Sequence, residues 1–382
     1  MANYDYEIVN GRKIRVRPKE TVSEIDKNGY FRRQPNHFTT PFGDGENDLK
    51  AEGNKRYRLV WAKLCHWSNR AAIARELEGL EDQISVNMVE HAPHEKNLGW
   101  EYVYNENNID PVFGDQFLSE AYYRADDDYQ GRTTVPALID TTTGKVVNND
   151  YNWLTTYFEV NFRPWHKKGA PELYPVELRE EIDKMNLWLF DNINNAVYRS
   201  SFSRSNEGHF DGVNTFYAAM DRLEKRLETN RFLFGDYVTD SDIRLYVTLA
   251  RLDIRYTAQL GETKRPLYTY KNLWGYAKEL WEIPAFAHHT DFAAIIRQGR
   301  IEGEEDGFRA STHYDLALPK IDWDAQWKVS TERAYLSSDP THPIYLGNNR
   351  RFDIDPTWYD LGAESPKKEE KETPPSCGCC CG

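Results

Sequence analysis

The chain has 382 residues, 40% of them hydrophobic, and its formal net charge at pH 7 is −13. This length and composition allow two domains with sizeable cores. So negative a chain is repelled by phosphate backbones unless its basic residues gather in one patch, and we find no such patch, so nucleic acid is not expected as a partner. The sequence also lacks an apolar run long enough to cross a membrane, so no membrane partner is expected.

The cysteines are distributed unevenly along the chain. Residues 1–376 contain only Cys65, and the other four lie together near the C-terminal end: Cys377, Cys379, Cys380 and Cys381. A body with one thiol cannot form internal disulfides, which fits a reducing compartment. The N-terminal residues also lack a basic region followed by an apolar run, the pattern of a secretory signal. We therefore expect a cytoplasmic location.

The first part of the chain is irregular and leads into a strand and a helix. Residues 1–52 mix charged residues, Gly and Pro with scattered aromatic residues, and we interpret them as an extension that packs on the body. Residues 57–62 are rich in β-formers, and apolar positions between 71 and 80 recur near one helical face. Cys65 lies between these two patterns, so we expect it at the N-terminus of the helix.

The next segments complete a β-α-β order that continues into a hairpin and a second helix. The expected elements are a strand at 84–89, a polar, aromatic-rich insertion between 90 and 130, a hairpin formed by 135–140 and 145–147, and a helix that begins near Tyr151. This order is typical of a thioredoxin-like layer. The sequence therefore predicts a thioredoxin-like domain over residues 53–170.

From Pro175 onward the apolar residues recur with a helical period. Two stripes stand out: Ile182, Met185, Leu189, Ile193 and Val197, and then Phe210, Val213, Met220, Leu223 and Leu227. Thr239 and Asp242 have the spacing of a capping box, with Asp in place of Glu, so a further helix is expected to begin there. The remaining predicted segments are an all-α domain at 171–310, a wrapping extension at 311–360, and a disordered charged linker with a Cys-rich tail at 361–382. The predicted fold class is thus α/β plus all-α.

Cys65 is the candidate nucleophile. Unpaired N–H groups and the helix dipole at a helix N-terminus favour a thiolate, and His66 could add positive charge when protonated. The alternative is a buried cysteine that only fills space. Val135-Pro136 favours the reactive role, because a proline before a strand often forms a cis peptide in thioredoxin-like layers. The backbone of its neighbour then faces the thiol and pairs with a peptide-like substrate. The alternative is a proline that simply marks the start of a strand.

A family resemblance extends these inferences. Tyr57-Arg58-Leu59 followed by Cys65-His66-Trp67-Ser68-Asn69-Arg70 resembles the "RYHLY…CPWAHR" segment of the Xi-class glutathione transferases, the glutathionyl-hydroquinone reductases. The other similar segments are Gly99-Trp100, 131–138, 147–149, 194–198, 232–236, 239–245, Arg251-Leu252-Asp253 with Tyr256, and 270–274. The resemblance extends over residues 28–297 of the chain.

The resemblance implies an enzyme with a thioredoxin-like domain, a helical C-terminal transferase domain and a homodimeric assembly. Glutathione or another small thiol would be the co-substrate, with no tightly bound cofactor, and an aromatic, quinone-type compound would be the second partner. The implied catalytic residues are Cys65, Tyr198, Tyr256 and Tyr270, whose phenol rings can stack on an aromatic substrate. The implied thiol-binding residues are Trp67, Trp100, Arg132, Val135, Pro136, Asp150 and Tyr151.

Two positions differ from the family pattern. The proline that follows the cysteine in the family is His66 here, and the family's Glu-Ser pair at the start of the second helix is Asp150-Tyr151. Asp150 can still bind an ammonium group, whereas Tyr151 is much larger than serine, so we expect glutathione to bind more weakly here. The open alternatives are an omega-like thiol oxidoreductase, acting on dehydroascorbate or in deglutathionylation, and a non-catalytic binding protein with this fold.

The tail cysteines form a separate motif. Clustered soft thiolates suit Cu(I) or Zn²⁺, so Cys377, Cys379, Cys380 and Cys381 are candidate metal ligands. They could instead act as resolving thiols for Cys65, or have no defined role. Cys379 is not followed by aliphatic residues, so the pattern for prenylation is not met.

Overall fold

The structure, a computed structural model, describes residues 4–17, 23–91, 98–261, 265–296 and 322–338. The tail cysteines and most of the predicted wrapping extension lie outside these residues. The strands are β1 (Tyr6–Val9), β2 (Arg12–Arg15), β3 (Tyr57–Trp61), β4 (Ile84–Met88), β5 (Glu90–His91), β6 (Trp100–Glu101), β7 (Ala137–Asp140) and β8 (Val146–Asn148). The helices are α1 (His66–Leu77), α2 (Leu118–Ala125), α3 (Leu154–Val160), α4 (Arg179–Leu189), α5 (Ala196–Phe202), α6 (Asn206–Arg226), α7 (Asp240–Arg251), α8 (Thr257–Gln259), α9 (Lys271–Trp281), α10 (Pro284–His288) and α13 (Trp323–Trp327).

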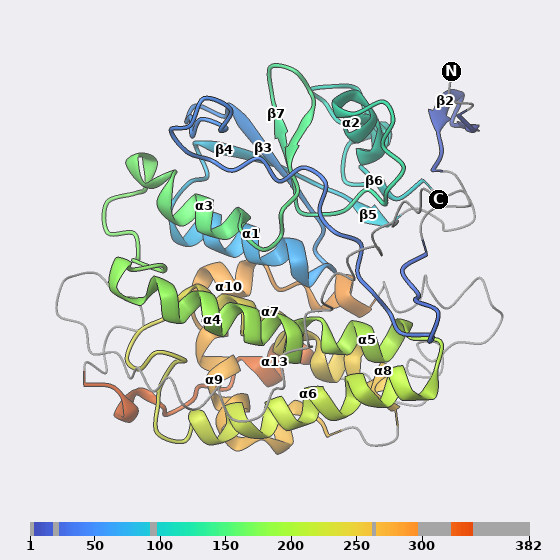
Figure 1. Cartoon of the computed structure of the whole chain (residues 1–382). Coiled ribbons are helices and arrows are strands. Elements are labelled where there is room, and N and C mark those ends of the chain that lie inside the picture. Colours follow the sequence, from blue (N-terminus) through green and yellow to red (C-terminus); the bar gives the residue numbers. More distant parts are fainter. Residues whose placement is uncertain (1–3, 18–22, 92–97, 262–264, 297–321, 339–382) are drawn as a thin grey trace, which may run out of the picture.

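The main sheet has the strand order β4-β3-β7-β8 and confirms the predicted thioredoxin-like layer. β3 runs parallel to β4 and antiparallel to β7, with Leu59 opposite Val86 on one side and Leu138 on the other. Every residue of β3 is buried, because α1 and α3 cover one face of the sheet and α2 covers the other. In Figure 1, α1 and α3 lie between the sheet and the helices α4 and α7.

The segment between 98 and 126 corrects one expectation. The sequence pattern suggested only a polar insertion, but α2 forms there and buries Leu118, Ala121 and Tyr122 against the sheet. Its start is fixed by Glu120, whose carboxylate accepts hydrogen bonds from the backbone N–H groups of Gln116 (2.7 Å) and Phe117 (3.0 Å). Eight residues are too few for a clear helical period, which explains why the pattern missed this helix.

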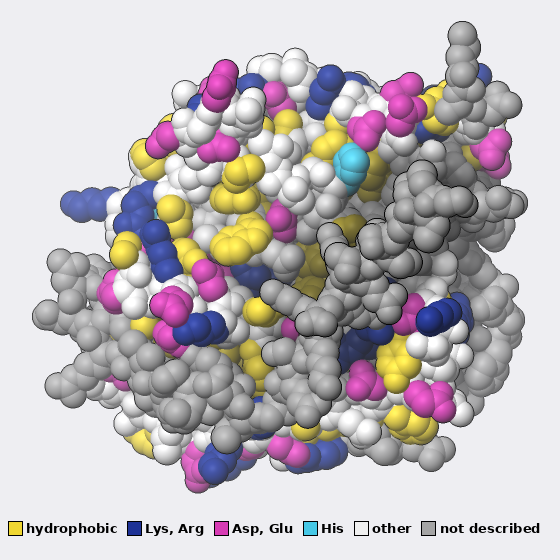
Figure 2. Space-filling view, viewed as in Figure 1, with side chains coloured by type: hydrophobic (Ala, Val, Ile, Leu, Met, Phe, Trp, Pro, Cys, Tyr) yellow, Lys and Arg dark blue, Asp and Glu magenta, His cyan; other side chains and the backbone are white. Residues whose placement is uncertain are grey.

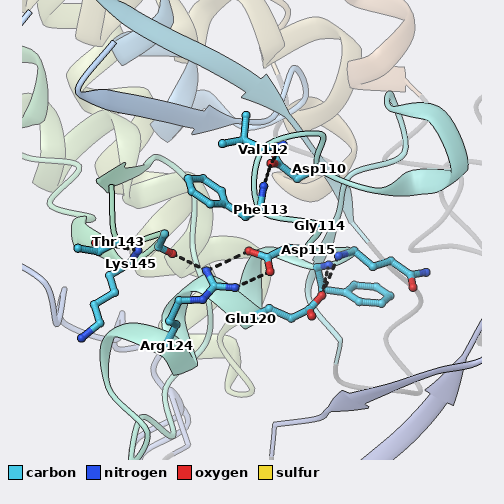
Figure 3. Close-up of polar contacts among 12 residues, drawn as sticks. Asp110, Val112, Phe113, Gly114, Asp115, Glu120, Arg124, Thr143 and Lys145 are labelled. Carbon is cyan, nitrogen blue, oxygen red and sulfur yellow. Dashed lines mark hydrogen bonds and ion pairs between the residues drawn. The ribbon is translucent and has the colours of Figure 1, made fainter. Parts of the chain in front are cut away.

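Arg124 links this segment to the hairpin beside it (Figure 3). The Arg124 guanidinium contacts the Asp115 carboxylate at 2.5 Å and donates to the carbonyl oxygen of Gly144 in the β7–β8 turn at 2.5 Å. Asp110 accepts from the N–H groups of Val112 (2.8 Å) and Phe113 (2.9 Å), which closes the loop before α2. The second face of the sheet is therefore covered by a cross-linked loop and helix.

The C-terminal half is helical and has its own core. The stripes predicted on α4, α5 and α6 face that core, with the exception of Phe210, which is 52% exposed. The expected capping box at the start of α7 is confirmed, because the N–H of Thr239 donates to the Asp242 carboxylate at 2.8 Å. Trp327 of α13 packs against Tyr246 and Trp274, so this part of the C-terminal extension does lie on the body.

Two further details differ from the expectations. The second helix of the thioredoxin-like layer begins at Leu154 instead of near Tyr151, because a turn closed by the Asp150 carbonyl precedes it. The N-terminal extension contains a short hairpin, β1–β2, and its Phe31 and Phe42 are buried. Within the described part of the chain, no helix has the length and apolarity needed to span a membrane.

Candidate active site

Cys65 connects β3 to α1 and lies at the position that caps the helix. Its backbone is extended, with φ −84° and ψ 116°, and its side chain is 9% exposed. The first N–H groups of a helix have no partner within the helix, so the thiol sits where partial positive charge collects. Among the described residues Cys65 is a free thiol, and the sequence placed it correctly at the helix N-terminus.

The thiol faces the backbone of the β7 hairpin. Cys65 Sγ lies 3.8 Å from the carbonyl oxygen of Val135, and the Val135–Pro136 peptide bond is cis, as the sequence suggested. This arrangement leaves a backbone edge beside the sulfur where an extended, peptide-like thiol can pair.

A buried arginine of the helical domain holds the loop in front of the nucleophile. The Arg251 guanidinium, at the end of α7, donates to the carbonyl oxygens of Leu64 (2.9 Å) and Lys63 (3.0 Å). It also donates to the carbonyl oxygen of Val247 at 2.8 Å, within its own helix. Arg251 is fully buried, so these backbone acceptors have no water to replace it. The position of Cys65 relative to the helical domain therefore depends on this side chain.

His66 corrects a second expectation, that it could add positive charge next to the thiol. The ring is buried, and this burial, followed by the charge of Arg251 and other arginines, lowers the pKa of His66 well below its usual value. His66 is therefore neutral near pH 7. Its Nδ1 lies 3.2 Å from the hydroxyl of Tyr256 and 3.3 Å from that of Thr248, so it belongs to a neutral hydrogen-bonded group behind the thiol.

A cavity of about 620 Å³ opens beside Cys65. The thioredoxin-like domain supplies one wall, with Trp100, Arg132 and Val135, and the helical domain supplies Tyr198 and Tyr256. Burial raises the pKa of both tyrosines, so each hydroxyl is protonated near neutral pH. The cavity therefore combines a nucleophile, aromatic walls and two phenol donors.

The N-terminal extension forms a third wall of this cavity. The Arg33 guanidinium carbon lies 4.3 Å from the Trp67 ring centroid and 4.6 Å from that of Tyr198, which are cation–π distances. Glu24 pairs with Arg132 at 2.8 Å and accepts from the N–H of Gln34 at 2.7 Å. The local pattern of residues 1–52 does not indicate these site residues, because it does not show which part of the body they contact.

Comparison with known proteins identifies the family. Residues 197–279 match the family model described as glutathione S-transferase, C-terminal domain. The Schizosaccharomyces pombe protein named glutathione S-transferase omega-like 2 is 34% identical over 281 residues, which cover 70% of this chain and 88% of that protein. The solved Xi glutathione transferase of Phanerochaete chrysosporium is 30% identical, with a TM-score of 0.69, covering 80% of this chain and 96% of that one. The chain belongs to the Xi class of the glutathione transferases.

A bacterial relative of this Xi-class enzyme supports the same assignment. Escherichia coli YqjG, named glutathionyl-hydroquinone reductase, is 33% identical over 240 residues, which cover 63% of this chain and 73% of YqjG. Its glutathione-bound structure has a TM-score of 0.63 to this fold at 30% identity, covering 74% of this chain and 91% of that one. The chain is therefore a thiol-dependent enzyme of the glutathione transferase superfamily.

The Xi-class fold brings most, but not all, of the residues implied by the resemblance into one cavity. Those that line it are Cys65, Trp67, Trp100, Arg132, Val135, Tyr198 and Tyr256. Pro136, Asp150, Tyr151 and Tyr270 are not among the lining residues. Tyr270 is buried in the core of the helical domain, under the guanidinium of Arg265 at 4.2 Å. No group of three His, Cys, Asp or Glu side chains in the described ranges is placed to hold a metal ion.

Asp150 and Tyr151 are occupied within the protein. The Asp150 carboxylate accepts from the side-chain amide of Asn36 at 2.9 Å and from the N–H of Asn152 at 3.0 Å. The Tyr151 ring packs against Trp67 with 4.7 Å between the ring centroids. Both residues thus make contacts within the protein, and neither lines the cavity.

Replacing Arg251 with Met should destabilise the fold and misplace the nucleophile. Buried carbonyl oxygens that lose their donor cost about 1–3 kcal/mol each, so we expect a loss of at least about 2 kcal/mol in urea unfolding. The alkylation rate of Cys65 by iodoacetamide should also change, because the loop before it is released. The control is Arg265→Met, whose exposed ion pair with Asp221 should contribute little. Equal effects of the two substitutions would contradict this account.

Replacing His66 with Gln should change how stability depends on pH. The unfolded chain binds a proton at His66 near pH 6.5, whereas the folded site does not, so wild-type stability falls as the pH drops below that value. Below that pH, His66 lowers the free energy of unfolding by an amount that approaches about 1.4 kcal/mol per pH unit. Urea unfolding between pH 5 and 7.5 should show a shallower fall for His66→Gln than for wild type or for the exposed control His37→Gln. An unchanged slope would show that His66 is not held neutral.

Proposed function

We propose that this enzyme removes a glutathionyl group from conjugated hydroquinones, with Cys65 as the nucleophile and a second glutathione as the reductant. The observation that carries the proposal is the position of Cys65 at the N-terminus of α1, facing an aromatic-walled cavity of about 620 Å³. Support for the thiol comes from the relatives, one of which is named a glutathionyl-hydroquinone reductase and has a glutathione-bound structure.

The proposed reaction has two steps. In the first, the Cys65 thiolate attacks the sulfur of the glutathionyl thioether, so an S–S bond forms and the bond between sulfur and the aromatic ring breaks. The electron pair of that bond stays on the ring carbon, which takes up a proton, and the free hydroquinone leaves. In the second step, the thiolate of another glutathione attacks the mixed disulfide, forms glutathione disulfide and releases the Cys65 thiolate. The aromatic ring is reduced, and the thioether sulfur and the sulfur of the second glutathione are oxidised to one disulfide.

The tyrosines on the helical wall fit the proton transfer of the first step. Tyr198 and Tyr256 line the cavity, and both are protonated near neutral pH because they are buried. The neutral His66 lies 3.2 Å from the Tyr256 oxygen. In the tautomer with the proton on Nδ1, His66 donates to that oxygen, which leaves the phenol proton of Tyr256 for the substrate. We infer that His66 orients Tyr256 as a general acid.

Replacing Cys65 with Ser should abolish the release of hydroquinone from glutathionyl-hydroquinone. Serine preserves the shape of the site but cannot form a disulfide, so we expect the rate to fall at least about 10³-fold, by analogy with other enzymes that lose their nucleophile. The measurement is hydroquinone release by chromatography at saturating glutathione. The control is Ser68→Ala, which changes another side chain of α1 that hydrogen-bonds the same loop without touching the sulfur chemistry.

The same assay separates this proposal from its alternatives. Turnover that survives in Cys65→Ser would show that another group performs the reaction. If wild type does not turn over the glutathionyl-hydroquinone but reduces dehydroascorbate or glutathionylated peptides, the result would favour an omega-like oxidoreductase. Inactivity toward all three substrate classes would favour a non-catalytic binding protein.

A further inference from the structure

The cavity is positively charged although the chain is negative. Its lining contains four arginines, Arg17, Arg33, Arg132 and Arg204, and one carboxylate, Glu24. Glu24 is already paired with Arg132, which leaves three guanidinium groups for which the described residues show no ion-pair partner. By contrast, Figure 2 shows acidic and basic side chains interspersed over the described part of one outer face. The concentration of arginine is therefore a property of the cavity and indicates an anionic ligand.

Arg33, on the wall formed by the N-terminal extension, is held in a fixed position by residues of both domains. Its Nε donates to the side-chain oxygen of Asn195 at 3.1 Å, and its guanidinium lies against Trp67 and Tyr198. Its Nη2 is buried and has no hydrogen-bond partner among the described residues. A buried N–H group without an acceptor costs free energy, and a carboxylate is an acceptor that a guanidinium group binds strongly. Arg33 is thus preorganised for a negatively charged group.

Aromatic side chains continue from Arg33 along the same wall. Phe31 and Phe202 both line the cavity, and their ring centroids are 5.4 Å apart. Arg204 lies two residues beyond Phe202, is exposed, and also lines the cavity. Burial and, next, the charge of Arg132 lower the pKa of Arg17, as expected where positive charge is not compensated. An aromatic ring that stacks on this wall would place its substituents within reach of Arg33 and Arg204.

We propose that the acceptor side of the cavity takes an aromatic group that carries a carboxylate, and that Arg33 binds this carboxylate. This inference rests on the proposed function, since it names the class of hydroquinone that the enzyme processes. Arg132, beside Val135 in the thioredoxin-like domain, is one of the residues implied to bind the thiol, so we assign the thiol end of a conjugate to Arg132 and its carboxylated ring to Arg33. Arg33 is a specificity-determining residue and takes no part in bond breaking.

The test compares two conjugates that differ in one group: glutathionyl-hydroquinone and the glutathionyl conjugate of 2,5-dihydroxybenzoate. Wild type should prefer the carboxylated conjugate by about tenfold or more in kcat/KM, as expected for a charge-assisted hydrogen bond. Arg33→Gln should lose most of this preference, and Arg33→Lys should keep part of it, because Lys retains the charge without the planar fork. The matched control is Arg32→Gln, which removes the same charge from an exposed neighbour that pairs with Asp26 at 3.0 Å.

Two results would overturn the inference. The first is a wild type that shows no preference for the carboxylated conjugate. The second is an Arg33→Gln variant in which kcat/KM falls equally for both conjugates and the KM for glutathione rises, which would assign Arg33 to the thiol end. Calorimetric binding of 2,5-dihydroxybenzoate and of hydroquinone to Cys65→Ser tests the same preference without turnover. If wild type turns over neither conjugate, the proposed function fails, and the calorimetric preference alone then decides whether Arg33 binds aromatic carboxylates.

Discussion

The bonds from Arg251 to the carbonyl oxygens of Lys63 and Leu64 are the constraint on which the active site depends. They join the last turn of α7 in the helical domain to the loop that delivers Cys65 to the start of α1. The capping box at Thr239 fixes the beginning of α7, so the helix is defined at both ends. One buried cation thereby links the loop that carries the thiol to the helix that precedes Tyr256, and both Cys65 and Tyr256 line the cavity.

The chemistry next to the thiol is different from what the residue types alone suggest. A histidine next to a cysteine suggests a thiolate–imidazolium ion pair, yet burial, followed by the charge of the surrounding arginines, keeps His66 neutral. The positive charge near Cys65 comes instead from the helix terminus and from guanidinium groups that cannot lose their protons. A neutral His66 is compatible with its proposed role in orienting Tyr256. The wall formed by the N-terminal extension then adds selectivity to a site whose reactive parts belong to the two domains.

Local sequence patterns predicted the parts of the molecule that local interactions determine. The strand-Cys65-helix order, the cap at Thr239 and the cis Val135–Pro136 bond each depend on a few adjacent residues. The eight-residue helix α2 was missed because it is too short for a clear apolar period and because its N-cap residue is Phe117, which is not one of the usual capping residues. Arg33 was missed because its partners, Trp67 and Tyr198, are distant in sequence. Tyr270 was chosen through resemblance, yet it lies in the helical core.

The central claim is that Cys65 attacks the sulfur, and not the ring carbon, of a glutathionyl conjugate. Mass spectrometry of the protein after one turnover with glutathionyl-hydroquinone, without added thiol, tests this most directly. The account predicts a glutathionyl group in disulfide linkage on the peptide that contains Cys65, removable by a reductant, together with one equivalent of free hydroquinone. An aryl group on Cys65 that resists reduction, or an unmodified Cys65 after hydroquinone has been released, would contradict it.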